Sequence, residues 1–240
     1  VQGELKVNRN DQLIRGDLVS SGISSGSNDA KIPRKLSAET YINFARDFKD
    51  HSVGAMLGTS VEDWRDETFH LEGSDYVSES ILTSNAQQVK DLTKTKTTYE
   101  SHAMASFFGR VNYSYKGKYI FTSNLRYDGS SRFVGNRWGL FPSASVAWRA
   151  SDEFFFDWAK PVLTDAKFRV SWGTNGNERV GNYESINQYN IGSYYNGVIG
   201  VTQTDKLANL DLSWESTEQT NIGLDVTLLD GRVSLAAGYY

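Results

Sequence analysis

Residues 107–128 decide the fold class, and they read FFGRVNYSYKGKYIFTSNLRYD. Up to the Lys116-Gly117 pair, aromatic, aliphatic and glycine residues alternate with mostly polar ones, and the alternation resumes at Tyr119. A period of two is typical of a β-strand whose two faces meet different surroundings. A short glycine-containing turn between two such runs joins antiparallel strands. The sequence therefore predicts a tight β-hairpin.

The same alternation predicts more strands further along the chain. One run spans Trp138 to Trp148, a second spans Ala166 to Asn175, and a third spans Asn221 to Leu228. The third is followed by Asp230-Gly231 and a return strand from Arg232, which indicates a second hairpin.

Three other segments carry weaker signals. The spacing of Tyr41, Phe44, Ala45 and Phe48 matches a helix as well as a strand, and we expect a strand there. Ser20 to Asp29 is rich in glycine and serine, which is typical of a flexible loop. Ser151 to Trp158 begins with a residue suited to an N-cap and predicts one helical turn at a membrane edge, or else an irregular turn.

Composition restricts the class of protein. The chain has 240 residues, no cysteine, 3 prolines, 21 glycines and 13% aromatic residues, and this profile favours β-structure. No run approaches the roughly 18 apolar residues of a membrane-spanning helix, which excludes a helical membrane protein. The mean hydropathy of -0.48 still permits a membrane barrel, because alternating strands average to a polar sequence.

The placement of charge points to a membrane barrel. Arginine or lysine on the lipid face near the midplane of a barrel costs about 2–4 kcal/mol. The full charges of the predicted strands avoid the apolar parity. We expect six of the intervening polar residues to face the lumen: Arg110, Asn112, Asn124, Arg126, Lys167 and Arg169.

Aromatic residues and connection lengths agree with this interpretation. Tyrosine, tryptophan and phenylalanine gather at both ends of the predicted strands, as two interfacial girdles would. These residues are Tyr113, Tyr115, Tyr119 and Trp148 near the short turns, and Tyr127, Phe133 and Trp138 at the opposite ends. The connections at 115–118 and 229–231 are short, whereas 62–98 and 177–211 read as long outer loops.

Several segments together resemble a known family, the SusC/RagA-type TonB-dependent outer-membrane transporters. The resemblance covers roughly Thr40 to Tyr240. The segments that carry it are GRVNYSY at 109–115, LRYDGSSRF at 125–133, NRWGLFPS at 136–143, SWGTNGN at 171–177 and LSWESTEQTNIGLD at 212–225.

The resemblance implies an all-β fold, an antiparallel transmembrane β-barrel of about 22 strands around an N-terminal plug. Residues 1–240 would supply about eight or nine of those strands, as part of the barrel domain and without the plug. The chain has no signal peptide and stops within a strand pattern, so we expect it to be a segment of a longer protein. The resemblance also implies a SusD-type surface lipoprotein as a partner and the TonB complex as the source of energy.

Six residues are candidates for contacts with cargo or partner in the outer loops. They are Trp64, Tyr76, Asp128, Arg132, Asn136 and Arg137. For the last four, the alternative is that they hold a short loop together through hydrogen bonds and charge pairs. Aromatic and amide side chains bind sugars and peptides equally well, so the sequence leaves the cargo open.

The sequence offers no catalytic or cofactor site. His51, His70 and His102 are far apart and read as solvated loop residues rather than metal ligands. Glu215 and Glu218 would lie on opposite faces of a strand, which argues against a glycosidase pair. The glycines of 173–181 lack the lysine of a phosphate loop and are typical of turns. We therefore expect no enzyme activity, no cofactor, no metal and no nucleic-acid partner.

The leading hypothesis is active import of an oligosaccharide or peptide across the bacterial outer membrane, in contact with outer-membrane lipid. One alternative is a complete small barrel of about eight strands that acts as an anchor or adhesin. Another alternative is a soluble extracellular β-domain that binds carbohydrate.

Overall fold

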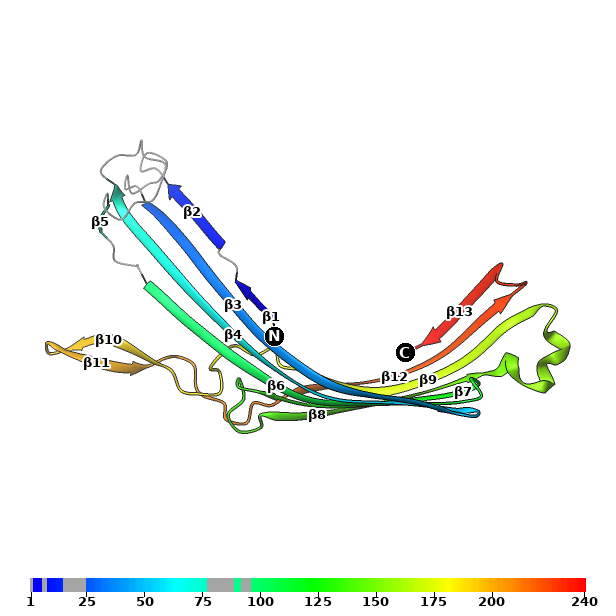
Figure 1. Ribbon diagram of the computed structural model, residues 1–240. Coiled ribbons are helices and arrows are strands. Elements are labelled where there is room, and N and C mark those ends of the chain that lie inside the picture. The colour runs from blue at the N-terminus through cyan, green and yellow to red at the C-terminus, as the bar shows by residue number, and fades with distance from the viewer. Residues whose placement is uncertain (1, 6–7, 15–24, 77–88, 92–95) are drawn as a thin grey trace. The chain divides into compact units, whose positions relative to one another are not determined.

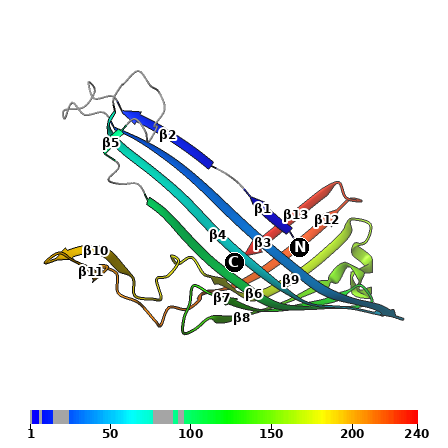
Figure 2. The same ribbon diagram turned by 60° about the vertical axis from the view of Figure 1, so that its left-hand side comes forward.

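The computed structural model describes residues 2–5, 8–14, 25–76, 89–91 and 96–240. Almost all regular structure in these ranges is antiparallel β, as predicted (Figures 1 and 2). Within the described residues the main sheet has 11 strands, in the order β1-β3-β4-β6-β7-β8-β9-β12-β13, with β2 paired to β3 and β5 paired to β4. Within the described ranges, no helix has the length and apolar character needed to cross a membrane.

The strand bounds follow the chain in order. The main sheet contains β1 (Gln2–Leu5), β2 (Asn8–Ile14), β3 (Ser25–Phe48), β4 (His51–Tyr76), β5 (Val89–Asp91), β6 (Lys96–Tyr115), β7 (Tyr119–Ser130), β8 (Trp138–Arg149), β9 (Leu163–Asn177), β12 (Glu215–Leu228) and β13 (Val233–Tyr239). A separate two-stranded sheet contains β10 (Tyr189–Tyr195) and β11 (Val198–Gln203). Two short 3-10 helices, η3 (Ala150–Asp152) and η4 (Phe154–Ala159), connect β8 to β9.

The described chain divides into two compact units. The first contains 1–38 and 62–103, and the second contains 39–61 and 104–240.

The second unit confirms the predicted strands and hairpins. In the β6–β7 hairpin, Tyr115 pairs with Tyr119, and Lys116 and Gly117 both have positive φ, at 51° and 67°. Two positive φ values are typical of the tight turn that suits the twist of a hairpin. The β12–β13 hairpin turns at 229–231, and residues 40–48 form part of β3, as predicted.

No second layer covers the sheet of this unit. Among the described residues the buried hydrophobic side chains are few, namely Phe133, Phe141, Ala150 and Ala166. The alternating apolar residues lie open instead, with Leu125 50% exposed and Val170 and Leu224 also exposed. A soluble domain would bury these side chains against another sheet or a helix, since that burial is its main stabilising term. The single apolar face therefore argues against the soluble β-domain and for a membrane wall.

A small buried cluster lies at the ends of the strands opposite the tight turns. Phe133 is 0% exposed, and its ring lies 5.6 Å from that of Trp214, which also meets Phe141 at 5.4 Å. A Cβ at Gly176 would overlap the Phe141 ring, so only glycine fits there. The prediction that Phe133 belongs to a lipid-facing girdle is wrong, because the 131–137 loop folds this ring inward over the strand ends.

The β6–β7 and β12–β13 connections are short and the β9–β12 connection is long, as predicted, whereas the β8–β9 connection on the short-turn side is longer than a tight turn. Ser151 to Trp158 does contain helical turns, but Ser151 does not cap them: η4 follows Glu153 without a side-chain cap. The hydroxyl of Ser151 lies 3.4 Å from Asp165 instead. The connection between β9 and β12 is long and holds the separate β10–β11 sheet.

The first unit corrects two predicted loops. Residues 62–76 belong to β4 and residues 96–98 to β6, so neither end of the predicted 62–98 loop is a loop. Ser25 to Asp29 lies in β3, while 20–24 and 77–88 are outside the described residues. These strands could not be predicted from the sequence because both of their faces are polar. Without an apolar face, the alternation of apolar and polar residues that identifies a strand is absent.

Candidate functional site

Strand register brings the six predicted lumen residues onto one face of the second unit. Arg110 pairs with Asn124, and Asn124 with Ser143. The pairs continue through Gly173 of β9. Directly opposed residues lie on the same face of a sheet. The shared polar face contains Arg110, Asn112, Asn124, Arg126, Lys167 and Arg169.

One hydrogen-bonded chain on this face runs across three strands. The Arg110 Nε–H donates to Oδ1 of Asn124 at 2.6 Å, and the Asn124 amide donates to the Ser143 hydroxyl at 3.1 Å. One step nearer the turn, the Thr122 hydroxyl donates to Asn112 at 3.0 Å. The polar side chains thus satisfy one another along the wall.

Arg126 is held at the far end of the same face. Its Nε–H donates to both carboxylate oxygens of Asp128, at 2.8 and 2.6 Å, and its Nη2 donates to the buried hydroxyl of Ser106 at 3.0 Å. The guanidinium also lies 6.0 Å from the centre of the Phe108 ring. Four contacts hold the Arg126 guanidinium in place. This arrangement suits a residue that stabilises the sheet better than one whose side chain moves.

A cluster of two cations and one carboxylate lies between β9 and β12. Asp225 meets Lys167 at 3.7 Å and Arg169 at 3.1 Å. Arg169 reaches Asp225 by lying across Gly223, its cross-strand partner. A hollow of about 480 Å³ opens beside this cluster, lined among others by Ser145, Lys167, Arg169, Ser171 and Asn221. The polar face therefore offers charged and hydroxyl groups around an open space.

Of the four residues proposed for contacts in the segment 128–137, three are engaged within the chain. Asp128 is buried beneath Arg126, and Arg132 donates to Asn182 at 3.0 Å and to the Glu178 carbonyl at 3.1 Å. Arg137 donates to the Phe133 carbonyl at 3.1 Å. Asn136 is exposed. This geometry favours the loop-fixing alternative for Asp128, Arg132 and Arg137.

Trp64 and Tyr76 are strand residues, not loop residues. Trp64 stacks on His102 at 4.5 Å between ring centroids, and the Lys35 ammonium lies 4.9 Å from its ring. Tyr76 ends β4 and pairs with Val89 in the backbone register. Their role in cargo or partner contact stays a prediction.

The three histidines also lie in strands, so their assignment to loops is wrong. His51 begins β4 and accepts or donates a hydrogen bond at 2.8 Å to the Tyr113 hydroxyl. His70 lies between Asp29 and Glu72, at 2.6 and 3.2 Å, and hydrogen bonding to Asp29 and then to Glu72 raises its pKa. Within the described ranges, no group of three His, Asp or Glu residues has a geometry that would hold a metal ion.

The remaining sequence candidates have structural explanations. Glu215 accepts from Asn177 at 2.9 Å and Glu218 from Trp172 at 2.5 Å, on opposite faces of β12 as predicted. The glycines at 173 and 176 belong to β9, where neighbouring side chains leave no room for a Cβ, so the turn explanation is wrong for them.

Trp214 is the residue that sequence reasoning overlooked. Its indole N–H donates to the Arg137 carbonyl at 2.9 Å, and its ring covers Phe133 and Phe141. Gly139 makes room for it, since a Cβ there would lie 2.9 Å from the indole. The available signal for this residue was a tryptophan just ahead of a predicted strand. Its contacts could not be predicted, because its partners are some 75 residues away in sequence.

In the second unit, a sheet with one apolar and one polar face has the character of the wall of a transmembrane β-barrel, and the chain forms part of such a barrel. Residues 6–240 match the family described as TonB dependent receptor-like, beta-barrel. The chain belongs to this outer-membrane family of transporters.

Individual relatives agree. The chain is 37% identical over 204 residues to TonB-dependent receptor P39 of Formosa agariphila. The matched region covers 84% of this chain and 20% of that protein. It is 33% identical over 212 residues to TonB-dependent receptor SusC of Bacteroides thetaiotaomicron, and the matched region covers 83% of this chain and 20% of that protein. A solved structure of the RagAB peptide transporter matches 98% of this chain and 26% of that chain, with a TM-score of 0.86 at 22% identity. The chain thus spans about a fifth of the length of these curated relatives.

Proposed function

We propose that this chain forms part of the wall of an outer-membrane importer that takes up a bulky nutrient, an oligosaccharide or a peptide, with energy from TonB. The observation that carries the proposal is the separation of chemistry between the two faces of one sheet. Exposed apolar residues such as Leu125 and Val170 suit lipid, and the polar face around Arg110 and Arg169 suits a water-filled lumen.

A SusD-type surface lipoprotein is the partner that we propose at the outer side. The long β9–β12 connection supports this, because it carries a separate hairpin with exposed Tyr189, Ile191 and Val201. Apolar side chains on an outer connection suit contact with another protein. In the full-length protein, deleting 189–203 is expected to abolish co-purification of the lipoprotein while leaving the barrel assembled.

The six polar-face residues are proposed to line the lumen. There they would contact the plug or the route of the cargo. The hollow beside Lys167 and Arg169 opens on this face.

Whole-cell uptake tests the proposal. Cells with and without the full-length protein receive fluorescent oligosaccharides and fluorescent peptides too large for general porins. Import of one class is expected only when both this protein and TonB are present. Uptake that persists without TonB would contradict the proposal, and a requirement for this protein in surface attachment alone would favour the anchor or adhesin alternative.

A further inference from the structure

The connection between β8 and β9 presents large aromatic side chains to its surroundings. Phe154 and Trp158 of η4 are each 81% exposed, and Phe155 between them is 48% exposed. Leaving so much aromatic surface in water is unfavourable, and clustered exposed apolar side chains mark a surface that meets a partner or a membrane. We call Phe154–Trp158 the aromatic foot.

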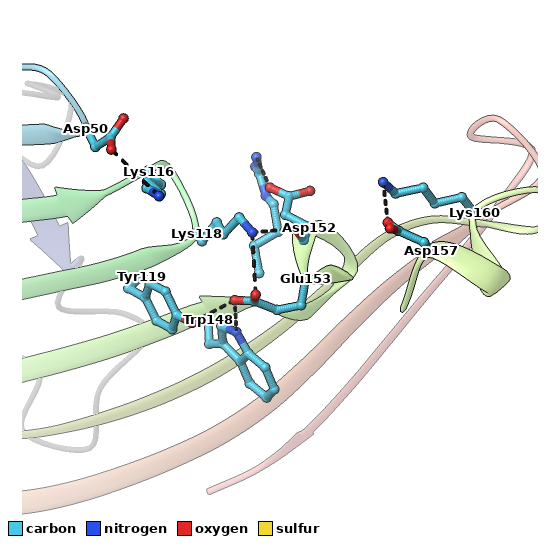
Figure 3. A network of polar contacts seen from close by, with 10 residues as sticks. Asp50, Lys116, Lys118, Tyr119, Trp148, Asp152, Glu153, Asp157 and Lys160 are labelled. Carbon is cyan, nitrogen blue, oxygen red and sulfur yellow. Dashed lines mark hydrogen bonds and ion pairs between the residues drawn. The ribbon is translucent and has the colours of Figure 1, made fainter. Parts of the chain in front are cut away.

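The aromatic foot is attached to the rim of the sheet by a fixed polar anchor. The Glu153 carboxylate accepts the Tyr119 hydroxyl at 2.7 Å and the Trp148 indole N–H at 3.4 Å (Figure 3). Lys118 donates to the Asp152 carbonyl at 2.5 Å and approaches Glu153 at 3.4 Å. The hydrogen bond from Tyr119, with help from Trp148 and Lys118, holds the pKa of the Glu153 carboxyl below its ordinary value. The anchor therefore stays charged and in place.

The anchor joins the aromatic foot to the apolar face rather than the polar one. Tyr119 and Trp148 are cross-strand partners and share the parity of Leu125 and Val146. The Phe155 ring lies 6.4 Å from that of Trp148. The exposed aromatics thus continue the apolar face past the short-turn ends of the strands.

Charge around the aromatic foot is balanced. Four cations at this end of the sheet each have a carboxylate partner: Lys118 with Glu153, Arg149 with Asp165, Lys160 with Asp157 and Lys116 with Asp50. The Lys160–Asp157 pair is 2.6 Å apart at the end of η4 (Figure 3). A surface without excess positive charge does not depend on anionic lipid.

We propose that Phe154, Phe155 and Trp158 enter the headgroup layer of the membrane leaflet on the short-turn side of the wall, so that the β8–β9 connection is a lipid-bound foot. The ligand class is a phospholipid surface, zwitterionic lipid included. Aromatic rings suit this layer because they combine a large apolar body with tolerance of the polar headgroup region. The inference rests on the proposed membrane placement of the wall.

Fluorescent labels on single cysteines test it in the full-length protein, purified without a surface lipoprotein and reconstituted in phosphatidylethanolamine vesicles. The variants are Phe154→Cys and Trp158→Cys on the foot, Leu125→Cys on the apolar face, and Ile191→Cys on β10 as a control of matched exposure, at 79%. This chain contains no cysteine of its own. Brominated lipid reports contact with the membrane and iodide reports contact with water.

The expected result is strong quenching by brominated lipid at 154, 158 and 125, and quenching by iodide at 191. Adding phosphatidylglycerol or salt should change none of these values. Iodide quenching at 154 and 158 with lipid quenching at 125 overturns the foot but leaves the wall intact. Protection of 154 and 158 from both quenchers also overturns it, since a protein would then cover the foot. Absence of lipid quenching at 125 as well would contradict the proposed function itself.

Discussion

The side chain of Arg169 lies directly over Gly223, its cross-strand partner in β12. A Cβ on Gly223 would stand 2.7 Å from Nε of Arg169 and 2.9 Å from its Cζ. The missing side chain is what lets the guanidinium cross the strand and meet Asp225 at 3.1 Å. Gly223 has ordinary strand geometry, and its lack of a side chain leaves the space that the Arg169 side chain occupies.

Gly223→Ala is expected to displace Arg169 from Asp225 and to lower the free energy of unfolding by about 1 kcal/mol, in the range of coupled neighbouring pairs. In an Arg169→Ala background the same change should cost nothing, because the clash is gone. Gly238, the partner of Gly223 on β13, provides the control, since its added Cβ would meet only the Ile222 carbonyl at 3.8 Å. Urea unfolding of Gly223→Ala, Arg169→Ala, the double variant and Gly238→Ala gives the coupling energy between residues 223 and 169. An equal loss of unfolding free energy from Gly223→Ala in both backgrounds would contradict the expected coupling.

Phe133→Ala is expected to open the buried cluster at the strand ends. Removing a fully buried phenylalanine costs about 3–5 kcal/mol, and Trp214 and the 131–137 loop lose their packing together. The neighbouring Val134 is 41% exposed, so Val134→Ala should cost little. Faster proteolysis of 178–214 on intact cells in the first variant alone is the expected readout. Equal protection in both variants would mean that the cluster does not hold the connection.

Leu125→Arg is expected to block barrel assembly. Leu125 is six residues from the start of β7, which at about 3.3 Å per residue and a tilt of about 45° places it about 14 Å up a band about 25 Å tall. Arginine on the lipid face at that depth costs about 2–4 kcal/mol. Ser145→Arg is the control, because Ser145 is on the polar face and lines the hollow. Heat-modifiable migration in gels reports folding, and equal loss in both variants would count against the assignment of the faces.

The first unit is expected to be more stable at mildly acidic pH. His70 lies far beyond the roughly 9–11 residues that a spanning strand uses, counted from His51. Its pKa is raised by hydrogen bonds to Asp29 and then Glu72, so its contribution is complete below the unfolded value of 6.5 and is lost as pH rises through the higher folded value. Protease resistance of 62–76 should fall across that window in the native protein and stay flat in His70→Gln.

His51→Gln is the matched control for this pH dependence, since His51 meets Tyr113 and Tyr115 rather than a carboxylate pair. It should keep the native response. A response that survives in His70→Gln would assign the effect to another group.

The strands of the second unit could be predicted because one face must be apolar along its whole length. This constraint makes apolar residues alternate with polar ones in residues 107–128. It also keeps Arg110 and Arg169 at positions that face away from the apolar side. The hairpins followed from glycine at the two tight turns. The parity also sorted the polar-face candidates onto one face before any register was known.

The same reasoning failed where lipid imposes no pattern. Residues 62–76 are held in β4 by cross-strand contacts such as Lys35 with Glu62 at 3.1 Å and Lys31 with Asp66 at 2.8 Å, which leave no apolar stripe in the sequence. The inward position of Phe133 depends on Trp214, about 80 residues further along the chain. Local periodicity carries no information about such distant partners.

Spin labels placed one at a time from Phe121 to Arg126 of β7 test the central claim most directly. In the reconstituted full-length protein, collisions with oxygen should be frequent at 121, 123 and 125, and collisions with a water-soluble nickel complex should be frequent at 122, 124 and 126. The two profiles should alternate out of phase with a period of two. Profiles without that period, or with oxygen favouring 124 and 126, would contradict a wall with lipid on one side and water on the other.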